Sequence, residues 1–313
     1  MKFYVGVTDN DWFRFLRRLR PEDINFWQPG GSVRFKAIEY GAPFLFKLKS
    51  PNNKIAGVGF FANHSFLPVS VAWDTFGFGN GCETLEELQR KIYGYRKDNH
   101  PNPQIGCITL SSSIFFDDSD WIDAPENWAN SIVQGKTYDT SSEIGEKIWN
   151  KVELLLLRYE TNYQNVNKII SPSEVNEQQP RYAQALLSRI RLGQGAFRVL
   201  VTEAYERKCA ISGEKTLPVL EAAHIKPYKD EGPHKVSNGV LLRADFHKLF
   251  DNGYLTITKD YEIEVSGRIK EEFENGKEYY QYHGKSLIYL PKEEKNRPNF
   301  EYIDWHNLNI YKG

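Results

Sequence analysis

The sequence has few sulfur-containing residues, no long apolar run and almost no net charge. There is one Met, and Cys82, Cys107 and Cys209 stand far apart in 313 residues. Without a C-x-x-C pair the chain lacks the spacing of a structural zinc site. An odd, scattered set of cysteines also argues against a secreted disulfide framework. We therefore expect a protein without structural zinc or disulfides.

The lack of long apolar runs excludes a transmembrane helix. The start, MKFYVGVTDND, has the features of neither a signal peptide nor a transit peptide, so we expect a soluble, cytoplasmic protein. The net charge of −1 means that nucleic-acid binding would depend on basic residues gathered on one surface. The length is comfortable for two domains.

Short strand-like runs separated by turns fill the first part of the chain. The pattern predicts strands at Lys2–Val7, Arg34–Ile38, Pro43–Lys49, Lys54–Ala62 and Ser65–Val71, and helices at Asp9–Leu19 and Thr84–Arg96. Residues 25–31 are expected to form a turn-rich loop with two adjacent aromatic residues. Closely spaced strands with tight turns are typical of a small β-barrel or curled sheet.

A connector follows the strand-rich part. An amphipathic pattern predicts a helix over 142–159, which could belong to either domain or to a dimer interface, and the polar stretch 170–180 is expected to be a linker. The predicted division is a first domain over 1–139, a helical connector and linker over 140–180, and a second domain over 181–313.

The order of elements in the first domain resembles the PUA-like superfamily, which includes the EVE, ASCH and SRA groups. The best-matching part is Gly41–Lys47 followed by Ile55–Phe61. The resemblance implies a barrel that holds a flipped or modified base in an aromatic-lined pocket, where stacking and a few polar groups provide recognition. The candidate pocket residues are Phe26, Trp27, Gln28, Trp73 and Gln134. Each aromatic residue taken alone is more often part of a core.

A second group of polar residues lies in a strand–loop–strand–helix pattern. Strand-like runs at Leu217–Ile225 and Gly239–Arg243 precede a short helix, which Asp245 is expected to cap and the Asn252-Gly253 turn to end. His224 ends the first run, Asn238 precedes the second, and His247 lies on the helix. Any one of these residues alone would more often be structural, and their joint order carries the prediction.

The order fits phosphodiester hydrolysis with a single metal ion. An imidazole suits the general base that activates water, and histidine nitrogen and carboxylate oxygen suit a divalent cation. His247 and Asp251 are four residues apart, so both project from one helix face and could grip one ion. Glu221 shares a strand face with residue 223 and could reach the metal from the other side.

At these residues the chain resembles the HNH, or ββα-metal, nucleases. The matching motifs are Ala222-Ala223-His224-Ile225, Asn238-Gly239-Val240-Leu241-Leu242-Arg243 and His247-Lys248-Leu249-Phe250-Asp251-Asn252-Gly253. The resemblance implies His224 as general base, Asn238 as the middle Asn and His247 as metal ligand, with one Mg²⁺ or Mn²⁺ per site. Many relatives place a metal-binding Asp or His where this chain has Ala223. Asp251 and Glu221 are the predicted substitutes.

Basic residues precede this motif. Six Arg or Lys residues against two Glu residues give 181–208 a net charge of +4. We expect Arg189, Arg191 and Arg198 to hold the DNA backbone, with Gln194 in a turn whose backbone N–H groups face a phosphate. His234 is expected to be solvent-facing or near DNA, and His283 and His306 to be structural or exposed.

The predicted fold is α+β: a PUA-like β-barrel with flanking helices, a helical linker and a C-terminal ββα-metal domain. The predicted function is that of a modification-dependent restriction endonuclease. It would read modified cytosine through the first domain and cleave double-stranded DNA through the second, alone or as a homodimer. Two alternatives remain open: an HNH nuclease directed at RNA, and a nucleic-acid-binding module with an inactive nuclease half.

Overall fold

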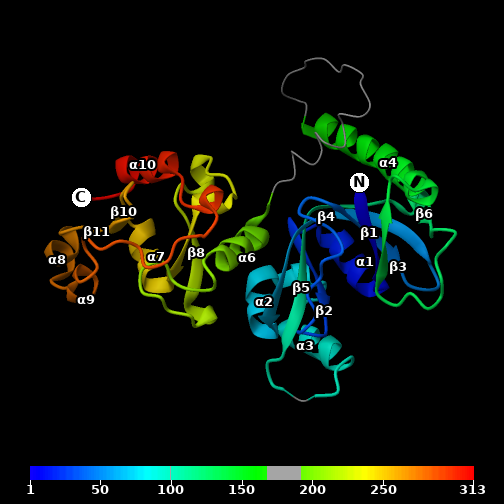
Figure 1. Ribbon diagram of the computed structural model, residues 1–313, viewed down its shortest axis with the longest axis horizontal. Coiled ribbons are helices and arrows are strands. Elements are labelled where there is room, and N and C mark those ends of the chain that lie inside the picture. The colour runs from blue at the N-terminus through cyan, green and yellow to red at the C-terminus, as the bar shows by residue number, and fades with distance from the viewer. Residues whose placement is uncertain (99, 168–191) are drawn as a thin grey trace. The chain divides into compact units, whose positions relative to one another are not determined.

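The computed structural model describes residues 1–98, 100–167 and 192–313, with only the backbone described for 160–167. The chain divides into two compact units, Met1–Gly193 (unit 1) and Gln194–Gly313 (unit 2) (Figure 1). The linker expected at 170–180 lies outside the described residues, and the three-part division of the chain stays a prediction. Within the described residues, no helix is both long and apolar enough to cross a membrane.

Unit 1 is built on one mixed sheet with helices. Its strands are β1 (Lys2–Thr8), β2 (Asp23–Gln28), β3 (Pro43–Leu48), β4 (Lys54–Pro68), β5 (Gln104–Phe115), β6 (Ile122–Asp123) and β7 (Gly135–Asp139). Its helices are α1 (Asn10–Leu19), α2 (Val69–Phe76), α3 (Leu85–Tyr93) and α4 (Glu143–Asn167). Asp9 and Thr84 cap α1 and α3 by accepting hydrogen bonds from backbone N–H groups of the first turn.

The strands follow the order β2-β5-β4-β3-β1-β7, with β6 paired to β4. β1 and β3 are parallel, and the other pairs are antiparallel. Two register shifts between β4 and β5 bend these long strands, as bulges do. No described strand pair joins β2 to β7, so the expected barrel is an open, bent sheet among the described residues. The predicted α+β class is confirmed.

Three local expectations for unit 1 were wrong. Residues 23–28 form a strand rather than a loop, because Trp27 and its neighbours pair with β5, a tertiary contact that outweighs the turn residues just after them. The expected strand at 34–38 is irregular. The runs 54–62 and 65–71 are not two strands, since β4 passes through both and ends at Pro68, where α2 begins.

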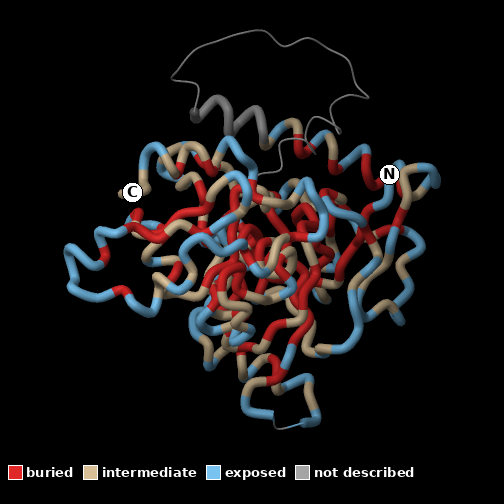
Figure 2. The backbone as a smooth tube through the Cα atoms, turned by 60° about the vertical axis from the view of Figure 1, so that its left-hand side comes forward, coloured by how far each residue is buried: buried red, intermediate tan, exposed pale blue. Residues whose placement is uncertain are grey.

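Helices cover both faces of the sheet. Trp12, Phe13 and Leu16 of α1 pack into one core cluster. Trp149 and Val152 of α4 pack into the other, so this helix belongs to unit 1, a choice that its amphipathic pattern left open. Figure 2 colours such buried positions red.

Unit 2 carries the nuclease motif on a compact core. Its elements are α6 (Gln194–Ala204), β8 (Leu220–His224), β9 (Gly239–Arg243), α7 (Ala244–Asp251), β10 (Leu255–Ile257), β11 (Ile263–Val265), α8 (Arg268–Phe273), α9 (Lys277–Tyr280) and α10 (Phe300–Asn309). One cluster of buried side chains joins α6, the β8–β9 hairpin, α7 and the β10–β11 pair. Cys209 lies in this core as a free thiol among the side chains that pack against the hairpin.

Candidate active site

The β8–β9 hairpin carries His224, the predicted base. The strands pair antiparallel with His224 opposite Gly239. A Cβ on Gly239 would lie 2.4 Å from Val201 Cγ2 and 2.9 Å from Phe197 Cζ, so only glycine lets α6 pack this closely on the hairpin. Phe197 of α6 consequently stacks on the His224 ring, with centroids 3.8 Å apart and planes 12° apart.

Asn238 closes the loop between the two strands. Its side chain is fully buried, and its Oδ1 accepts a hydrogen bond from Lys226 N at 2.9 Å. Its Nδ2 donates to Lys226 O at 2.9 Å and to Pro233 O at 3.0 Å. The backbone carbonyl of Asn238 accepts from Ile225 N at 2.9 Å. These bonds fix the path of the chain directly after His224.

His234 lies against the predicted base. Its Nδ1 is 2.9 Å from His224 Nε2, and Tyr228 stacks on its ring at 4.5 Å between centroids. Burial lowers the pKa of His224 to about 4, His234 adds to the shift, and Asp251 opposes it. His224 is therefore neutral at pH 7 and able to accept a proton. The sequence held no signal for this pairing beyond one His in a Gly-Pro-rich loop.

His247 lies between two carboxylates. Its Nδ1 is 2.5 Å from Glu221 Oε2, and its Nε2 is 3.3 Å from Asp251 Oδ2. Burial would lower the pKa of His247, but the hydrogen bonds to Asp251 and Glu221 raise it above its usual value. Because the two nitrogens of an imidazole point in different directions, one ion cannot use Glu221, Asp251 and a single ring nitrogen in this arrangement.

The donor set suits a hydrated divalent cation with few protein ligands. Among the described residues, no group of three or more His, Cys, Asp or Glu side chains is already disposed around one ion position. His247 and Asp251 offer one nitrogen and one carboxylate from the same helix face, and Mg²⁺ usually keeps several waters. Ala223 is fully buried in the hydrophobic core, so that position supplies no ligand.

We expected Asp245 to cap α7, and this expectation was wrong. Arg243 occupies the capping position, and no side chain makes a capping hydrogen bond. Asp245 instead accepts two hydrogen bonds from Arg243, from Nε at 2.6 Å and from Nη2 at 2.7 Å. The guanidinium lies over the Phe246 ring, which holds this pair beside the site. Asp245 thus forms a bidentate ion pair with Arg243 instead of the expected cap.

The predicted DNA contacts are only partly described. Arg189 and Arg191 lie outside the described residues. Gln194 is exposed at the start of α6, and Arg198 lies half-buried two turns from the end of that helix. Further along the predicted basic stretch, Arg207 Nη2 lies 2.6 Å from Glu203 Oε1. This ion pair neutralises part of the positive charge of the stretch.

The five predicted pocket residues of unit 1 do not gather in one place. Phe26 and Gln28 share one face of β2, and Trp27 points to the other, where its Nε1 donates to Asn80 O at 3.1 Å. Trp73 lies on α2 near Phe78. Gln134 is exposed before β7, and its carbonyl accepts from Val7 N.

A residue absent from the predicted set lies on the face of Phe26 and Gln28. His64 of β4 pairs with Ile108 of β5, which in turn pairs with Phe26, so three strands bring these side chains into one row. His64 is 3% exposed, and neither ring nitrogen has a hydrogen-bond partner among the described residues. Burial, and then the charge of Arg34, lowers its pKa to about 4.

Gly106 brings polar atoms together beside His64. A Cβ at Gly106 would lie 3.1 Å from His64 Nε2, 3.2 Å from Gln28 Oε1 and 3.3 Å from Gly30 O. Phe35 and Phe66 flank the His64 ring, at 6.5 and 4.9 Å between centroids. The glycine thus leaves three polar atoms facing one spot on an aromatic surface. His64 could not be picked out from the sequence, because the row exists only through strand pairing.

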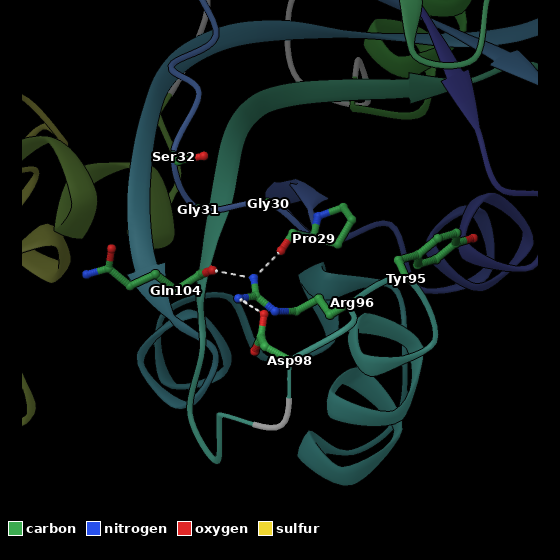
Figure 3. A pocket seen from close by; sticks show the side chains of 8 residues that line it. All are labelled: Pro29, Gly30, Gly31, Ser32, Tyr95, Arg96, Asp98 and Gln104. Carbon is green, nitrogen blue, oxygen red and sulfur yellow. Dashed lines mark hydrogen bonds and ion pairs between the residues drawn. The ribbon is translucent and has the colours of Figure 1, made fainter.

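A cavity of about 450 Å³ shares Gly30 with this group of polar atoms. Figure 3 shows the residues that line it. Its wall includes Gly30, Gly31, Ser32 and Gln104. Arg96 reaches into it, with Nη1 donating to Pro29 O at 2.6 Å and to Gln104 O at 3.1 Å and Nη2 paired with Asp98 at 2.6 Å. Gly30 belongs both to this wall and to the polar group beside His64, although none of the five predicted pocket residues lines the cavity.

Comparison with known families bears on unit 2 directly. The family model described as HNH endonuclease matches residues 209–258, which span the hairpin, its loop and α7. This segment is an HNH nuclease module. The match confirms the resemblance found in the sequence motifs and supports nuclease activity for this segment. No curated protein matches the chain.

The solved structures that show likeness to this chain include the following three. Two are crystal structures of mutants of ZmASCH from Zymomonas mobilis. One has 10% identity and a TM-score of 0.34, and covers 48% of this chain and 98% of its own. The other has 8% identity and a TM-score of 0.32, and covers 47% and 94%. The third is the modification dependent TagI restriction endonuclease, with 15% identity and a TM-score of 0.28 over 92% of this chain and 75% of its own.

Proposed function

We propose that this protein is a metal-dependent DNA endonuclease of a restriction system, which acts in the cytoplasm on DNA that carries modified cytosine. The observation that carries the proposal is the group formed by His224, Asn238, His247 and Asp251 on the HNH hairpin and helix. One neutral imidazole, a nitrogen–carboxylate pair and a rigid loop are the parts that single-metal phosphodiester hydrolysis needs.

His224 serves as the general base. Its ring is held on Phe197, and its Nδ1 takes a proton from the attacking water. The O–H bond of that water breaks, the hydroxide oxygen bonds to phosphorus, and the bond from phosphorus to the leaving oxygen breaks with its electron pair. The leaving oxygen then takes a proton from solvent. Asp251 stabilises the imidazolium, since its charge raises the pKa of His224.

His247 and Asp251 would hold the divalent cation, Mg²⁺ or Mn²⁺. The cation would neutralise charge on the scissile phosphate. Glu221 forms a hydrogen bond with Nδ1 of His247, the ring nitrogen on the side away from Asp251. A carboxylate in this position orients a metal-binding imidazole and makes it a stronger ligand. Glu221 is thus assigned a supporting role beside the two ligands rather than the direct contact that its strand position suggested.

Arg189, Arg191, Arg198 and Gln194 would contact the DNA backbone, which positions the duplex without reading its sequence. Specificity would come from unit 1. The aromatic face around Phe26, together with Gln28 and His64, has the stacking surface and directional polar atoms that a flipped base needs. Two cuts are needed to break a duplex, so we further propose a homodimer or transient pairing on DNA.

Cleavage of matched DNA duplexes tests the proposal. The duplexes would be unmodified or carry 5-methyl-, 5-hydroxymethyl- or glucosylated cytosine, each with Mg²⁺ or Mn²⁺, and would be treated with wild type and His224→Ala. We expect cleavage of a modified duplex only, and its loss in the variant. Equal cleavage of all duplexes would contradict the proposal that unit 1 recognises modified cytosine. Cleavage of RNA in preference to DNA would show that RNA is the substrate.

A further inference from the structure

The His224 ring is contacted on two sides by other rings. Phe197 stacks on it from α6, and His234 approaches it edge-on from the loop, with centroids 4.9 Å apart and planes 61° apart. Tyr228 stacks on His234 with planes 12° apart. Four rings therefore form one connected row, and the hydrogen bond between the two imidazoles lies in the middle of it.

The loop that carries His234 is rigid at both ends. Asn238 binds the backbone of Lys226 and of Pro233, which directly precedes His234. Gly232 N donates to Pro227 O at 3.0 Å across the same loop. The position of His234 is thus fixed by the backbone on one side and by the Tyr228 ring on the other.

The hydrogen bond leaves one nitrogen of His224 for the attacking water. A neutral imidazole carries one proton, and the nitrogen that accepts a proton from water must be free of it. Nε2 of His224 is 2.9 Å from His234 Nδ1, so that nitrogen is engaged with His234 whichever ring donates, and only Nδ1 can take a proton from water. Proton transfer to Nδ1 requires the tautomer in which Nε2 carries the proton and donates it to His234 Nδ1. The opposite tautomer would place the proton on Nδ1, toward the water.

We propose that His234 is a positioning residue, which holds the general base His224 in its Nε2-protonated tautomer through a hydrogen bond accepted at Nδ1. The inference rests on the proposed nuclease function. It assigns a role to a residue outside the His–Asn–His set, and it gives the loop between the strands a part in catalysis. Of the groups facing His224, Phe197 from α6 cannot titrate. His247 and Asp251 from α7 influence His224 through their charge.

Three variants separate acceptor, stacking and loop effects. His234→Phe keeps a flat ring against Tyr228 but removes the acceptor. His234→Asn restores an acceptor, because its Oδ1 can lie near the place of Nδ1. Tyr228→Phe keeps the stack and serves as the control. Thermal unfolding of each variant reports whether the fold is intact.

The first readout is single-turnover cleavage of one DNA duplex with Mn²⁺ from pH 5 to 9. We expect His234→Phe to lower the plateau rate about 10- to 100-fold with unchanged DNA affinity and unchanged thermal midpoint. His234→Asn should recover most of the rate, and Tyr228→Phe should match wild type. Equal rates for all variants, or equal losses in the Phe and Asn variants, would overturn the proposal.

The second readout does not depend on cleavage. Nitrogen-15 NMR of His224 distinguishes the two tautomers directly. Wild type should show the proton on Nε2, and His234→Phe should show a mixture. If the wild-type ring is already mixed, the inference fails even when the enzyme cuts DNA. If the tautomer responds but no nucleic acid is cleaved, the nuclease proposal fails and the hydrogen bond stands.

Discussion

The two units differ in the hydrogen bonds that their buried and half-buried histidines make. In unit 2, His224 bonds His234, His247 lies between two carboxylates, and His306 bonds Thr256 Oγ1 at 2.8 Å and Phe250 O at 3.1 Å. In unit 1, His64 is as buried as His306, but neither of its nitrogens has a partner among the described residues.

The difference agrees with the separate roles proposed for the two units. A nuclease site that must act on any phosphate gains from groups already fixed in place, because no reorganisation is then needed during the reaction. An unpaired buried polar group costs about 1–3 kcal/mol and is retained where something else will pair with it. The unpaired nitrogens of His64 are what the proposed base-reading surface would need, because a bound base could pair with them.

The largest effect should come from removing the base. His224→Ala should lower the cleavage rate by about 10²- to 10⁴-fold, because it removes the imidazole that is proposed to take the proton from water. His283→Ala is the matched control, since its Nδ1 only accepts from Val265 N outside the site. A similar loss in both variants, measured in single-turnover assays, would show that the effect is not specific to the base.

Asn238→Ala should be the most damaging change to stability. It removes three side-chain hydrogen bonds and leaves the Lys226 and Pro233 backbone groups unpaired in a buried loop. We expect a loss of about 2–4 kcal/mol in the free energy of unfolding of unit 2. Asn252→Ala, which removes one exposed hydrogen bond, should change the urea midpoint far less.

Acid should destabilise both units. Burial lowers the pKa of His64 and of His306 to about 4, below the usual value of 6.5. The unfolded chain therefore binds more protons between these values, so the stabilisation present above pH 6.5 is lost as pH falls toward 4. Protonation of each of these His residues should lower the free energy of unfolding by about 2 kcal/mol between pH 7 and pH 5. Urea unfolding at the two pH values, repeated with His306→Phe, measures one of these contributions.

The smallest stability change should come from His64→Phe. This variant removes a polar group without a partner and keeps a ring of similar size, so the free energy of unfolding should stay within about 1 kcal/mol of wild type or increase. Discrimination between modified and unmodified DNA should be lost. His306→Phe is the contrasting change, because it breaks two buried hydrogen bonds. Equal destabilisation by both variants would remove the difference between the units.

Much of unit 2 could be predicted from sequence because its signals are local. His247 and Asp251 are one helical turn apart, and Asn238 stands next to the strand it precedes. The roles of His234 and His64 were missed for a common reason. One depends on how a loop folds back and the other on the register of three strands, and neither contact has a fixed spacing in the chain. The same limit misplaced the strand at 23–28, which exists only through pairing with β5.

Gly239 has a consequence for how mutational data on this protein should be read. α6 can lie this close to the hairpin because Gly239 has no side chain. Any larger residue would push the helix outward and carry Phe197 off the face of His224. In a saturation scan scored on DNA cleavage, position 239 would therefore look as intolerant as a catalytic residue. It would do so through spacing alone, without a functional group of its own.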